Sequence, residues 1–208
     1  MKFVLFVEGK LEKEVLPDFL HRWLDTRLPQ RVRIAPVRFE GWRDYYKEIG
    51  KKVSLSLTGR SGQDVIAGIG LLDLYGPTFY PDDKTTAAER IAWAKTHLEG
   101  RVSHPRFRQH FAVHETEAWL LADPANLPVE VRNTLPGRTD QPETVNFNEP
   151  PARLLERLYL SGTSKAYRKV IHGSNLFQAL DPEVAAQKCP NLRLLLEDML
   201  RLAQAAIA

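Results

Sequence analysis

Two carboxylates in this sequence directly follow runs of apolar residues. Glu8 comes after residues 3–7, and Asp73 comes after residues 65–72. Unbroken apolar runs of this length are typical of parallel strands that are buried on both faces. Ligands of open α/β sheets bind beyond the carboxyl ends of such strands. We therefore expect Glu8 and Asp73 to face each other across the point where the strand order reverses.

A third predicted strand, residues 107–114, runs into Glu115 and Glu117. Carboxylate oxygens are the ligands that Mg²⁺ and Mn²⁺ prefer, and burying such charges without a cation or a donor is costly. The sequence therefore predicts a site for one of these ions made by Glu8, Asp73 and one of Glu115 or Glu117. The alternative for any single carboxylate is a structural one, in which it stabilises a helix N-terminus.

The elements that must position these residues alternate between strand and helix over the first 120 residues or so. A strand followed by a helix, repeated along the chain, predicts an α/β fold of three layers, α/β/α, around a parallel sheet with right-handed crossovers. Pro36, within the predicted strand 31–39, favours an edge position. The predicted strands are residues 3–7, 31–39, 65–72 and 107–114, and the predicted helices begin near residues 11, 45 and 87.

The composition changes at Asp123, where prolines become frequent. Residues 124–151 are predicted to be an irregular connection, and helices resume at residue 152 and end with a long apolar-faced helix after Pro190. The expected organisation is an α/β domain over residues 1–123, then a Pro-rich connection and helical C-terminal extension over residues 124–208.

The overall composition is that of a soluble globular protein, with 43% hydrophobic and 26% charged residues. The net charge of +3 permits an anionic partner without requiring one. Cys189 is the only cysteine, which excludes an intrachain disulfide and a thiolate metal cluster and fits a reducing, cytoplasmic location. The apolar start is too short for a signal peptide, and no stretch is long enough for a membrane span.

Basic side chains gather in two segments of the sequence. The group at residues 165–172 is interpreted as a set of phosphate contacts for nucleic acid, and a solvated helix face is the alternative. Arginines near residues 31–43 are interleaved with aromatic residues, a pattern that nucleic-acid tracks also use. The predicted nucleic-acid-binding residues are Lys10, Lys165, Arg168, Lys169 and His172.

Three short motifs together resemble a known family. Glu8-Gly9-Lys10-Leu11-Glu12 resembles the Glu-Gly-x-x-Glu motif of Toprim domains, which occur in topoisomerases, bacterial primases and the OLD (overcoming-lysogenisation-defect) nucleases. With Asp73-x-Tyr75-Gly76 and the segment 114–121, it is more closely similar to small stand-alone Toprim-like proteins. That family is catalogued only as a domain of unknown function, and its genes often neighbour ATPases in bacterial defence loci.

The resemblance implies a Toprim-like fold and a metal-dependent nuclease for DNA or RNA, the effector of an anti-phage defence system working with an ATPase. Glu8, Asp73 and Glu12 would be catalytic, with Mg²⁺ or Mn²⁺ bound, and the protein could form a homo-oligomer. Tyr75 departs from the pattern, because Toprim enzymes carry a second aspartate there, and Glu115 or Glu117 would have to replace it. Two alternatives stay open: a non-catalytic subunit that binds the ATPase or nucleic acid, and phosphoryl chemistry on a small nucleotide.

Overall fold

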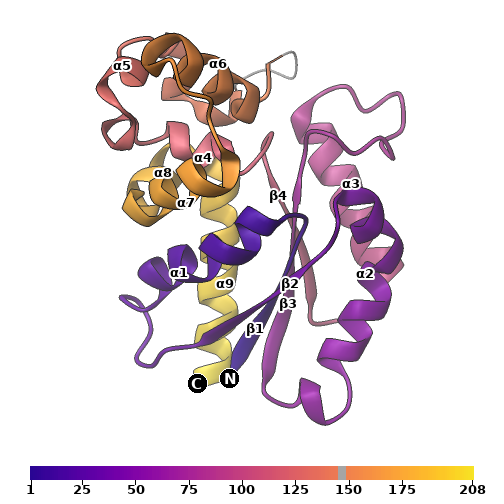
Figure 1. Cartoon of the computed structure of the whole chain (residues 1–208). Helices are drawn as coiled ribbons and strands as arrows, with labels where there is room; N and C mark the ends of the chain where they lie inside the picture. The colour runs from indigo at the N-terminus through magenta and orange to yellow at the C-terminus, as the bar shows by residue number, and fades with distance from the viewer. Residues whose placement is uncertain (145–148) are drawn as a thin grey trace.

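A four-stranded parallel sheet forms the centre of the computed structural model, which describes residues 1–144 and 149–208 (Figure 1). The strand order is β2-β1-β3-β4, so the order reverses between β1 and β3 as the alternating pattern requires. The predicted α/β class is therefore confirmed, and Pro36 does lie on an edge strand. The strands are β1 (Lys2–Val7), β2 (Arg33–Arg38), β3 (Val65–Asp73) and β4 (Phe107–Ala112).

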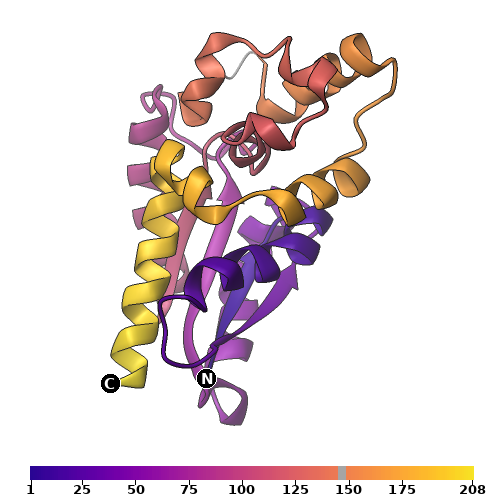
Figure 2. The same cartoon turned by 90° about the vertical axis from the view of Figure 1, so that its left-hand side faces the viewer.

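Helices cover both faces of the sheet (Figure 1). Helices α2 and α3 pack on one face, and α1 and α9 pack on the other. Helices α4 to α8 follow β4 in the chain and lie near the carboxyl ends of the strands, while both termini lie at the opposite end (Figures 1 and 2). The helices are α1 (Lys10–Leu24), α2 (Trp42–Leu57), α3 (Ala87–Val102), α4 (Glu117–Leu121), α5 (Val129–Arg132), α6 (Pro151–Thr163), α7 (Lys169–Ala179), α8 (Pro182–Lys188) and α9 (Pro190–Ile207).

Strand β1 is apolar from Phe3 to Val7 because both of its faces are buried there. Phe3, Leu5 and Val7 contribute to the core beneath α1 and α9, whereas Val4 and Phe6 contribute to the core beneath α2 and α3. The alternation follows from the two-residue period of a strand. The end of β1 is thus held firmly from both sides, and it carries Glu8.

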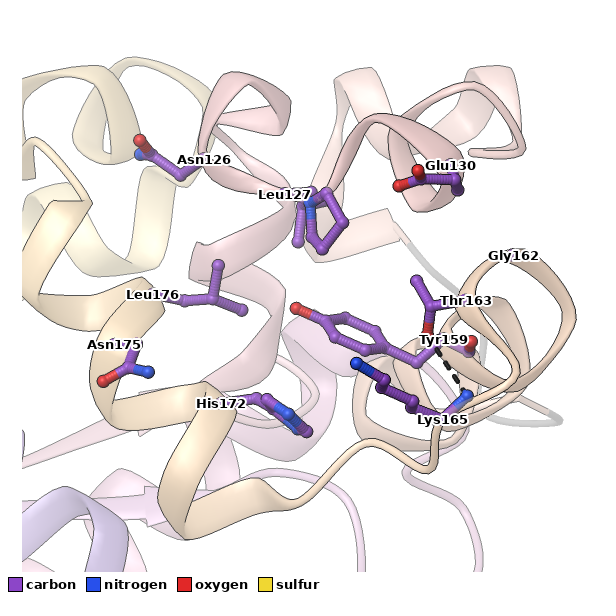
Figure 3. Close-up of a pocket in the computed structure, with 11 residues that line it drawn as sticks. Asn126, Leu127, Glu130, Tyr159, Gly162, Thr163, Lys165, His172, Asn175 and Leu176 are labelled. Atoms are coloured by element: carbon purple, nitrogen blue, oxygen red, sulfur yellow. Dashed lines mark hydrogen bonds between the residues drawn. The ribbon is translucent and has the colours of Figure 1, made fainter.

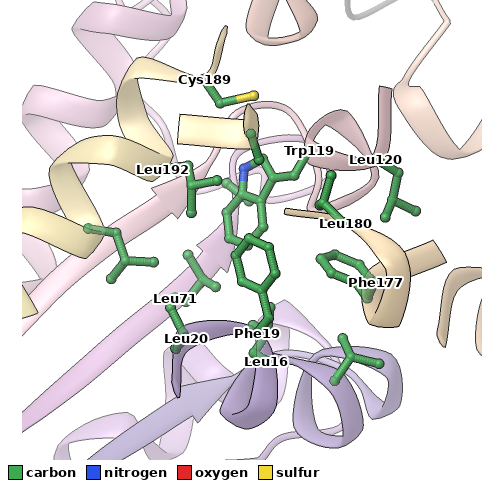
Figure 4. Close-up of a cluster of buried hydrophobic side chains, with 14 of the residues drawn as sticks. Leu16, Phe19, Leu20, Leu71, Trp119, Leu120, Phe177, Leu180, Cys189 and Leu192 are labelled. Atoms are coloured by element: carbon green, nitrogen blue, oxygen red, sulfur yellow. The ribbon is translucent and has the colours of Figure 1, made fainter. Parts of the chain in front are cut away.

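A stack of aromatic rings anchors the short helix α4 (Figure 4). The Trp119 ring lies parallel to the Phe19 ring of α1 at 5.9 Å, and the Phe177 ring of α7 meets Phe19 edge-on at 5.7 Å. Trp119 is fully buried. Aromatic pairs in these geometries add about 0.5–1.5 kcal/mol each beyond area burial. The stack fixes α1, α4 and α7 relative to one another, and each of these helices carries a residue of the candidate site.

The C-terminal part of the chain contributes to the same core as the strands. Helices α7, α8 and α9 all contact α1, and α9 also contacts β3 and β4. Residues 124–144, expected to be irregular, contain α5 and three short 3-10 helices. The division of the chain into residues 1–123 and residues 124–208 stays a prediction. In the described part of the chain, no helix combines the length and apolarity needed to cross a bilayer.

Candidate active site: a buried carboxylate cluster

Glu8 lies directly after β1, half-buried, at the carboxyl edge of the sheet. The backbone N–H groups of Asp73 and Trp42 lie close enough to its carboxylate to lower the pKa of Glu8, against the larger effect of burial. Because β1 and β3 are adjacent and parallel, with Val7 beside Leu71, the two strand ends bring Glu8 next to the backbone of Asp73. The sheet topology therefore assembles the pair that the sequence suggested.

Gly9 makes room for Glu12. The backbone of Gly9 is extended, with φ −127° and ψ 179°, so its conformation is one that any residue can adopt. A Cβ atom at this position would lie only 2.4 Å from Oε2 of Glu12. Gly76, after Asp73, is different, since its φ of +105° does favour glycine. In the Glu-Gly-x-x-Glu motif of this chain, the glycine lets the second carboxylate fold back against the first turn of α1.

Thr116 connects the ends of the strands to α1 and α4. Its backbone N–H donates to Oδ1 of Asp73 (3.2 Å), and its hydroxyl donates to Oε1 of Glu12 (3.1 Å). The same hydroxyl oxygen is 3.5 Å from Oε2 of Glu117. Thr116, Glu12 and Glu117 are all buried. One residue thereby orients three carboxylates.

Lys169, the first residue of α7, supplies a positive charge to this cluster. Its Nζ lies 3.0 Å from Oε1 of Glu117 and 3.5 Å from Oε1 of Glu12. The Lys169 side chain remains 41% exposed, so it extends from the surface of the protein to the buried acids. Loss of solvation lowers its pKa, but Glu117, Asp73 and Glu12 outweigh this and raise it above the ordinary value.

Burial raises the pKa values of the acids themselves. Loss of solvation, and then repulsion from Glu12, raises the pKa of Glu8 to about 7. Loss of solvation also raises the pKa of Glu117 to about 7, against the opposing effect of Lys169. The pKa of Asp73 is raised well above its usual range for the same reason, with Glu12, Glu8 and Glu117 adding to it. Mutual repulsion among Glu8, Glu12, Asp73 and Glu117 shows that they form one electrostatic cluster, the carboxylate cluster below.

The carboxylate cluster has unsatisfied acceptors. Oε2 of Glu8 and Oε2 of Glu12 are buried and accept no hydrogen bond from the described residues. Buried carboxylate oxygens of this kind need a cation or a proton. As placed, however, no three Asp, Glu, His or Cys side chains of residues 1–144 and 149–208 are arranged to hold a metal ion. Carboxylate oxygens are the ligands that suit a hard divalent cation. The positive charge of Lys169 compensates part of the negative charge of the acids.

The two glutamates after β4 have different surroundings. Glu117 belongs to the carboxylate cluster, whereas Oε2 of Glu115 accepts a hydrogen bond from the backbone N–H of Ala152 (2.9 Å), at the start of α6. Loss of solvation raises the pKa of Glu115, and the Ala152 N–H opposes this. Tyr75 is 38% exposed in the loop beyond Asp73. Of the two glutamates proposed to compensate for Tyr75, Glu117 is the better placed.

The predicted nucleic-acid-binding residues lie in three different surroundings. Lys169 enters the carboxylate cluster, and Lys10, at the start of α1, forms an exposed ion pair with Glu14 (3.8 Å). The other three lie on or just before α7, where Arg168 and Lys165 are exposed and Nδ1 of His172 accepts the backbone N–H of Arg168 (2.7 Å).

The arginines near residues 31–43 lie before β2, at both of its ends and in the first turn of α2. In the register of the parallel strands, Arg33 lies beside Lys2 at the amino end of the sheet, and Arg38 lies beside Val7 at the carboxyl end. Only the second end adjoins Glu8. Arg38 and Arg43 lie at the end that adjoins Glu8, and a nucleic-acid track along this basic segment stays a prediction.

Two participants were not identified from the sequence. Thr116 lies between two candidate glutamates, but its residue type indicates no site, because a threonine after a strand usually has a local capping role. Lys169 was assigned to nucleic acid because it lies among other basic residues. Its position beside Glu117 depends on the packing of α7 against α1 and α4, which a periodic pattern does not specify.

Fold and site together define an α/β protein with a buried acidic site at the carboxyl edge of a parallel sheet. A family model described as "Domain of unknown function (DUF4276)" matches residues 7–200. The chain therefore belongs to this family, and the match includes every residue of the carboxylate cluster.

Among solved structures, the chain is similar to the C-terminal region of the Burkholderia pseudomallei OLD protein. The TM-score is 0.50 and the identity 17%, over 100% of this chain and 98% of that one. At this identity the likeness concerns the fold, and it agrees with the Toprim-like arrangement expected from the motifs. No curated protein matches the sequence.

Proposed function

We propose that this protein hydrolyses phosphodiester bonds of DNA or RNA in a reaction that depends on Mg²⁺ or Mn²⁺. The observation that carries the proposal is the convergence of Glu8, Glu12, Asp73 and Glu117 on one buried site at the carboxyl edge of the sheet. Carboxylates with such raised pKa values are frequent at catalytic sites. The fold shared with the C-terminal region of an OLD protein supports the same class of activity.

Glu8, Asp73 and Glu12 would hold the ion, because two of them carry buried oxygens without donors. When bound, the ion neutralises charge on the scissile phosphate and acidifies a coordinated water. Thr116 keeps Asp73 and Glu12 in place through its N–H and its hydroxyl. These contacts are the chain's own means of pre-organising the ligands.

Lys169 and Glu117 have complementary roles in this scheme. The ammonium group of Lys169 has three N–H donors, so it can donate to a non-bridging phosphate oxygen while it remains beside Glu117. Glu117, with a pKa of about 7, exchanges a proton near neutral pH and is suited to general acid–base catalysis. We further propose, from the sequence resemblance, that an ATPase works with this protein in anti-phage defence.

A non-catalytic role is the second candidate. Lys169 already compensates part of the acidic charge, and Tyr75 replaces the second aspartate of the Toprim pattern. A subunit that keeps the fold only to bind nucleic acid or an ATPase would bind no metal ion. It would still retain the ion pairs of Lys169 with Glu117 and Glu12.

A nuclease assay with Asp73→Asn and Tyr75→Phe tests the proposal. Wild type and Tyr75→Phe should cleave single- or double-stranded substrates with Mg²⁺ or Mn²⁺, because a phenol is not among the oxygen ligands that these ions prefer. Asp73→Asn should lose at least about 100-fold in rate, which corresponds to about 2.7 kcal/mol of transition-state stabilisation. Undiminished cleavage by Asp73→Asn would contradict the assignment. If wild type cleaves neither DNA nor RNA with either ion and the ATPase present, the non-catalytic role is favoured.

A further inference from the structure

A cavity of about 770 Å³ lies beside α7, outside the carboxylate cluster (Figure 3). The segment 126–130, the end of α6, the loop after it and α7 form its walls. Small-molecule sites usually have volumes of 300–1,000 Å³. The cavity is therefore large enough for one nucleotide, and none of the residues that line it belongs to the carboxylate cluster.

The interior combines an aromatic ring with apolar side chains. Tyr159 is 5% exposed, and its ring lies beside the His172 ring at 5.1 Å with an interplanar angle of 32°. Leu127 and Leu176 also line the cavity, and Figure 3 shows the Tyr159 hydroxyl pointing toward Leu176. A planar heterocycle can contact the small part of the Tyr159 ring that stays accessible, since aromatic pairs also favour edge-to-face geometries.

The side of the cavity near α7 presents donors for an anion. Nδ1 of His172 accepts the backbone N–H of Arg168, so a neutral His172 carries its proton on Nε2 and donates from there. Lys165 lines the same side, and its backbone N–H donates to Oγ1 of Thr163 (3.3 Å), which orders the loop (Figure 3). Glu130 lies on the opposite side of the Tyr159 ring (Figure 3).

We propose that this cavity binds a nucleoside monophosphate. The base packs against Tyr159 and presents an exocyclic amino group to Glu130, while the phosphate accepts hydrogen bonds from Lys165 and His172. An acceptor at one end and two donors at the other match a ligand with an amino edge and a phosphate, and they disfavour a purely apolar ligand. The cavity thereby selects adenine or cytosine nucleotides over those of uracil or thymine.

Helix α7 connects the cavity to the carboxylate cluster, because His172 lines the cavity and Lys169 contacts Glu117 and Glu12. Lys169 and His172 are three residues apart, about 4.5 Å along the helix axis. Tyr167 lies between the two sites, because its ring is 5.2 Å from Tyr159 and 5.8 Å from His172. Burial and then Glu117 raise the pKa of Tyr167. If the proposed nuclease function holds, the bound nucleotide is the one next to the scissile phosphate of a strand; a free nucleotide is the other source of the same chemistry.

Calorimetric titration with AMP, UMP, adenosine and inorganic phosphate, in EDTA so that no metal-dependent chemistry occurs, tests the site. AMP should bind more tightly than UMP, adenosine or phosphate. Lys165→Ala should weaken AMP binding by about 10-fold, as expected for loss of one charge-assisted contact. Lys51→Ala, an exposed lysine of α2, is the matched control and should bind as wild type does. Glu130→Gln should abolish the preference for AMP over UMP.

A competing single-stranded oligonucleotide distinguishes the two sources. Displacement of AMP by the oligonucleotide assigns the cavity to a strand, and unchanged AMP binding assigns it to a free nucleotide; both outcomes uphold the site. Absence of AMP binding to wild type, or equal binding by Lys165→Ala, overturns it. Because titration in EDTA does not depend on cleavage, the cavity can fail while the nuclease proposal stands, and the reverse also holds.

Discussion

The ammonium nitrogen of Lys169 lies 3.0 Å from Oε1 of Glu117, a carboxylate that is fully buried. Breaking a buried pair by removing one partner is destabilising, since the remaining charge is uncompensated. Glu117 can avoid that penalty by taking up a proton. The consequence of losing Lys169 should therefore depend on pH.

Lys169→Met should lose more stability at pH 8 than at pH 6. With the lysine present the pKa of Glu117 is about 7, and without it the pKa rises further. At pH 6 the buried acid is then protonated in both proteins. At pH 8 the variant must keep Glu117 protonated in the folded state, which costs free energy because the unfolded chain would release that proton. Urea unfolding at both pH values measures the difference. Lys169→Met/Glu117→Gln should recover stability at pH 8, and equal losses at the two pH values would contradict the pairing.

Glu8→Gln should be more stable than wild type above pH 7. The folded pKa of Glu8 is about 7 and the unfolded value about 4.5, so the folded state binds more protons between these values and its stability falls as pH rises through them. Glutamine removes the ionisation, and the gain at pH 8 should be about 1–3 kcal/mol after allowance for partial exposure.

The comparison that checks this is urea unfolding at pH 4 and pH 8, with the exposed Glu14→Gln of α1 as control. At pH 4 the two carboxyl variants should match wild type closely. Mg²⁺ should stabilise wild type at pH 8 and leave Glu8→Gln unaffected. A variant no more stable than wild type at pH 8 would show that Glu8 ionises without penalty.

The sequence predicted the part of the site that depends on strands. Apolar runs located β1 and β3, and the topology rules then required Glu8 and Asp73 to approach. The side chains that complete the site come from helix packing. Lys169 reaches Glu117 because the stacked rings of Phe19, Trp119 and Phe177 hold α1, α4 and α7 together, and amphipathic patterns do not specify which helix faces meet.

Gly9 illustrates a second reason why sequence reasoning was incomplete. A glycine after a strand is compatible with a turn, with close backbone approach or with a neighbouring side chain that needs space. The sequence contains no feature that separates these cases. Only the 2.4 Å approach of Glu12 to a hypothetical Cβ identifies the third.

Binding of nucleic acid should depend on the basic residues before and on α7 and not on those at the amino end of β2. Lys165→Glu and Arg168→Glu should each weaken binding of a labelled oligonucleotide and reduce the salt dependence by roughly one phosphate contact. Arg33→Glu makes the same charge change at the far end of β2 and should bind as wild type does. Fluorescence anisotropy between 50 and 200 mM salt measures all three, and an equal effect of Arg33→Glu would indicate non-specific attraction.

Thr116→Val should destabilise the carboxylate cluster with almost no change in shape. The Thr116 hydroxyl has one hydrogen, and the shorter contact, 3.1 Å to Glu12, receives it. Valine removes this hydroxyl donor and leaves Oε1 of Glu12 with only the Lys169 ammonium group at 3.5 Å, at a cost of about 1–3 kcal/mol. Thr116→Ser keeps the hydroxyl and should lose less. Urea unfolding ranks the variants, and cleavage assays add a second readout: because the Thr116 N–H still holds Asp73, Thr116→Val should keep part of its activity, whereas Asp73→Asn should not. Equal stability of the valine and serine variants would show that the hydroxyl makes no net contribution to the cluster.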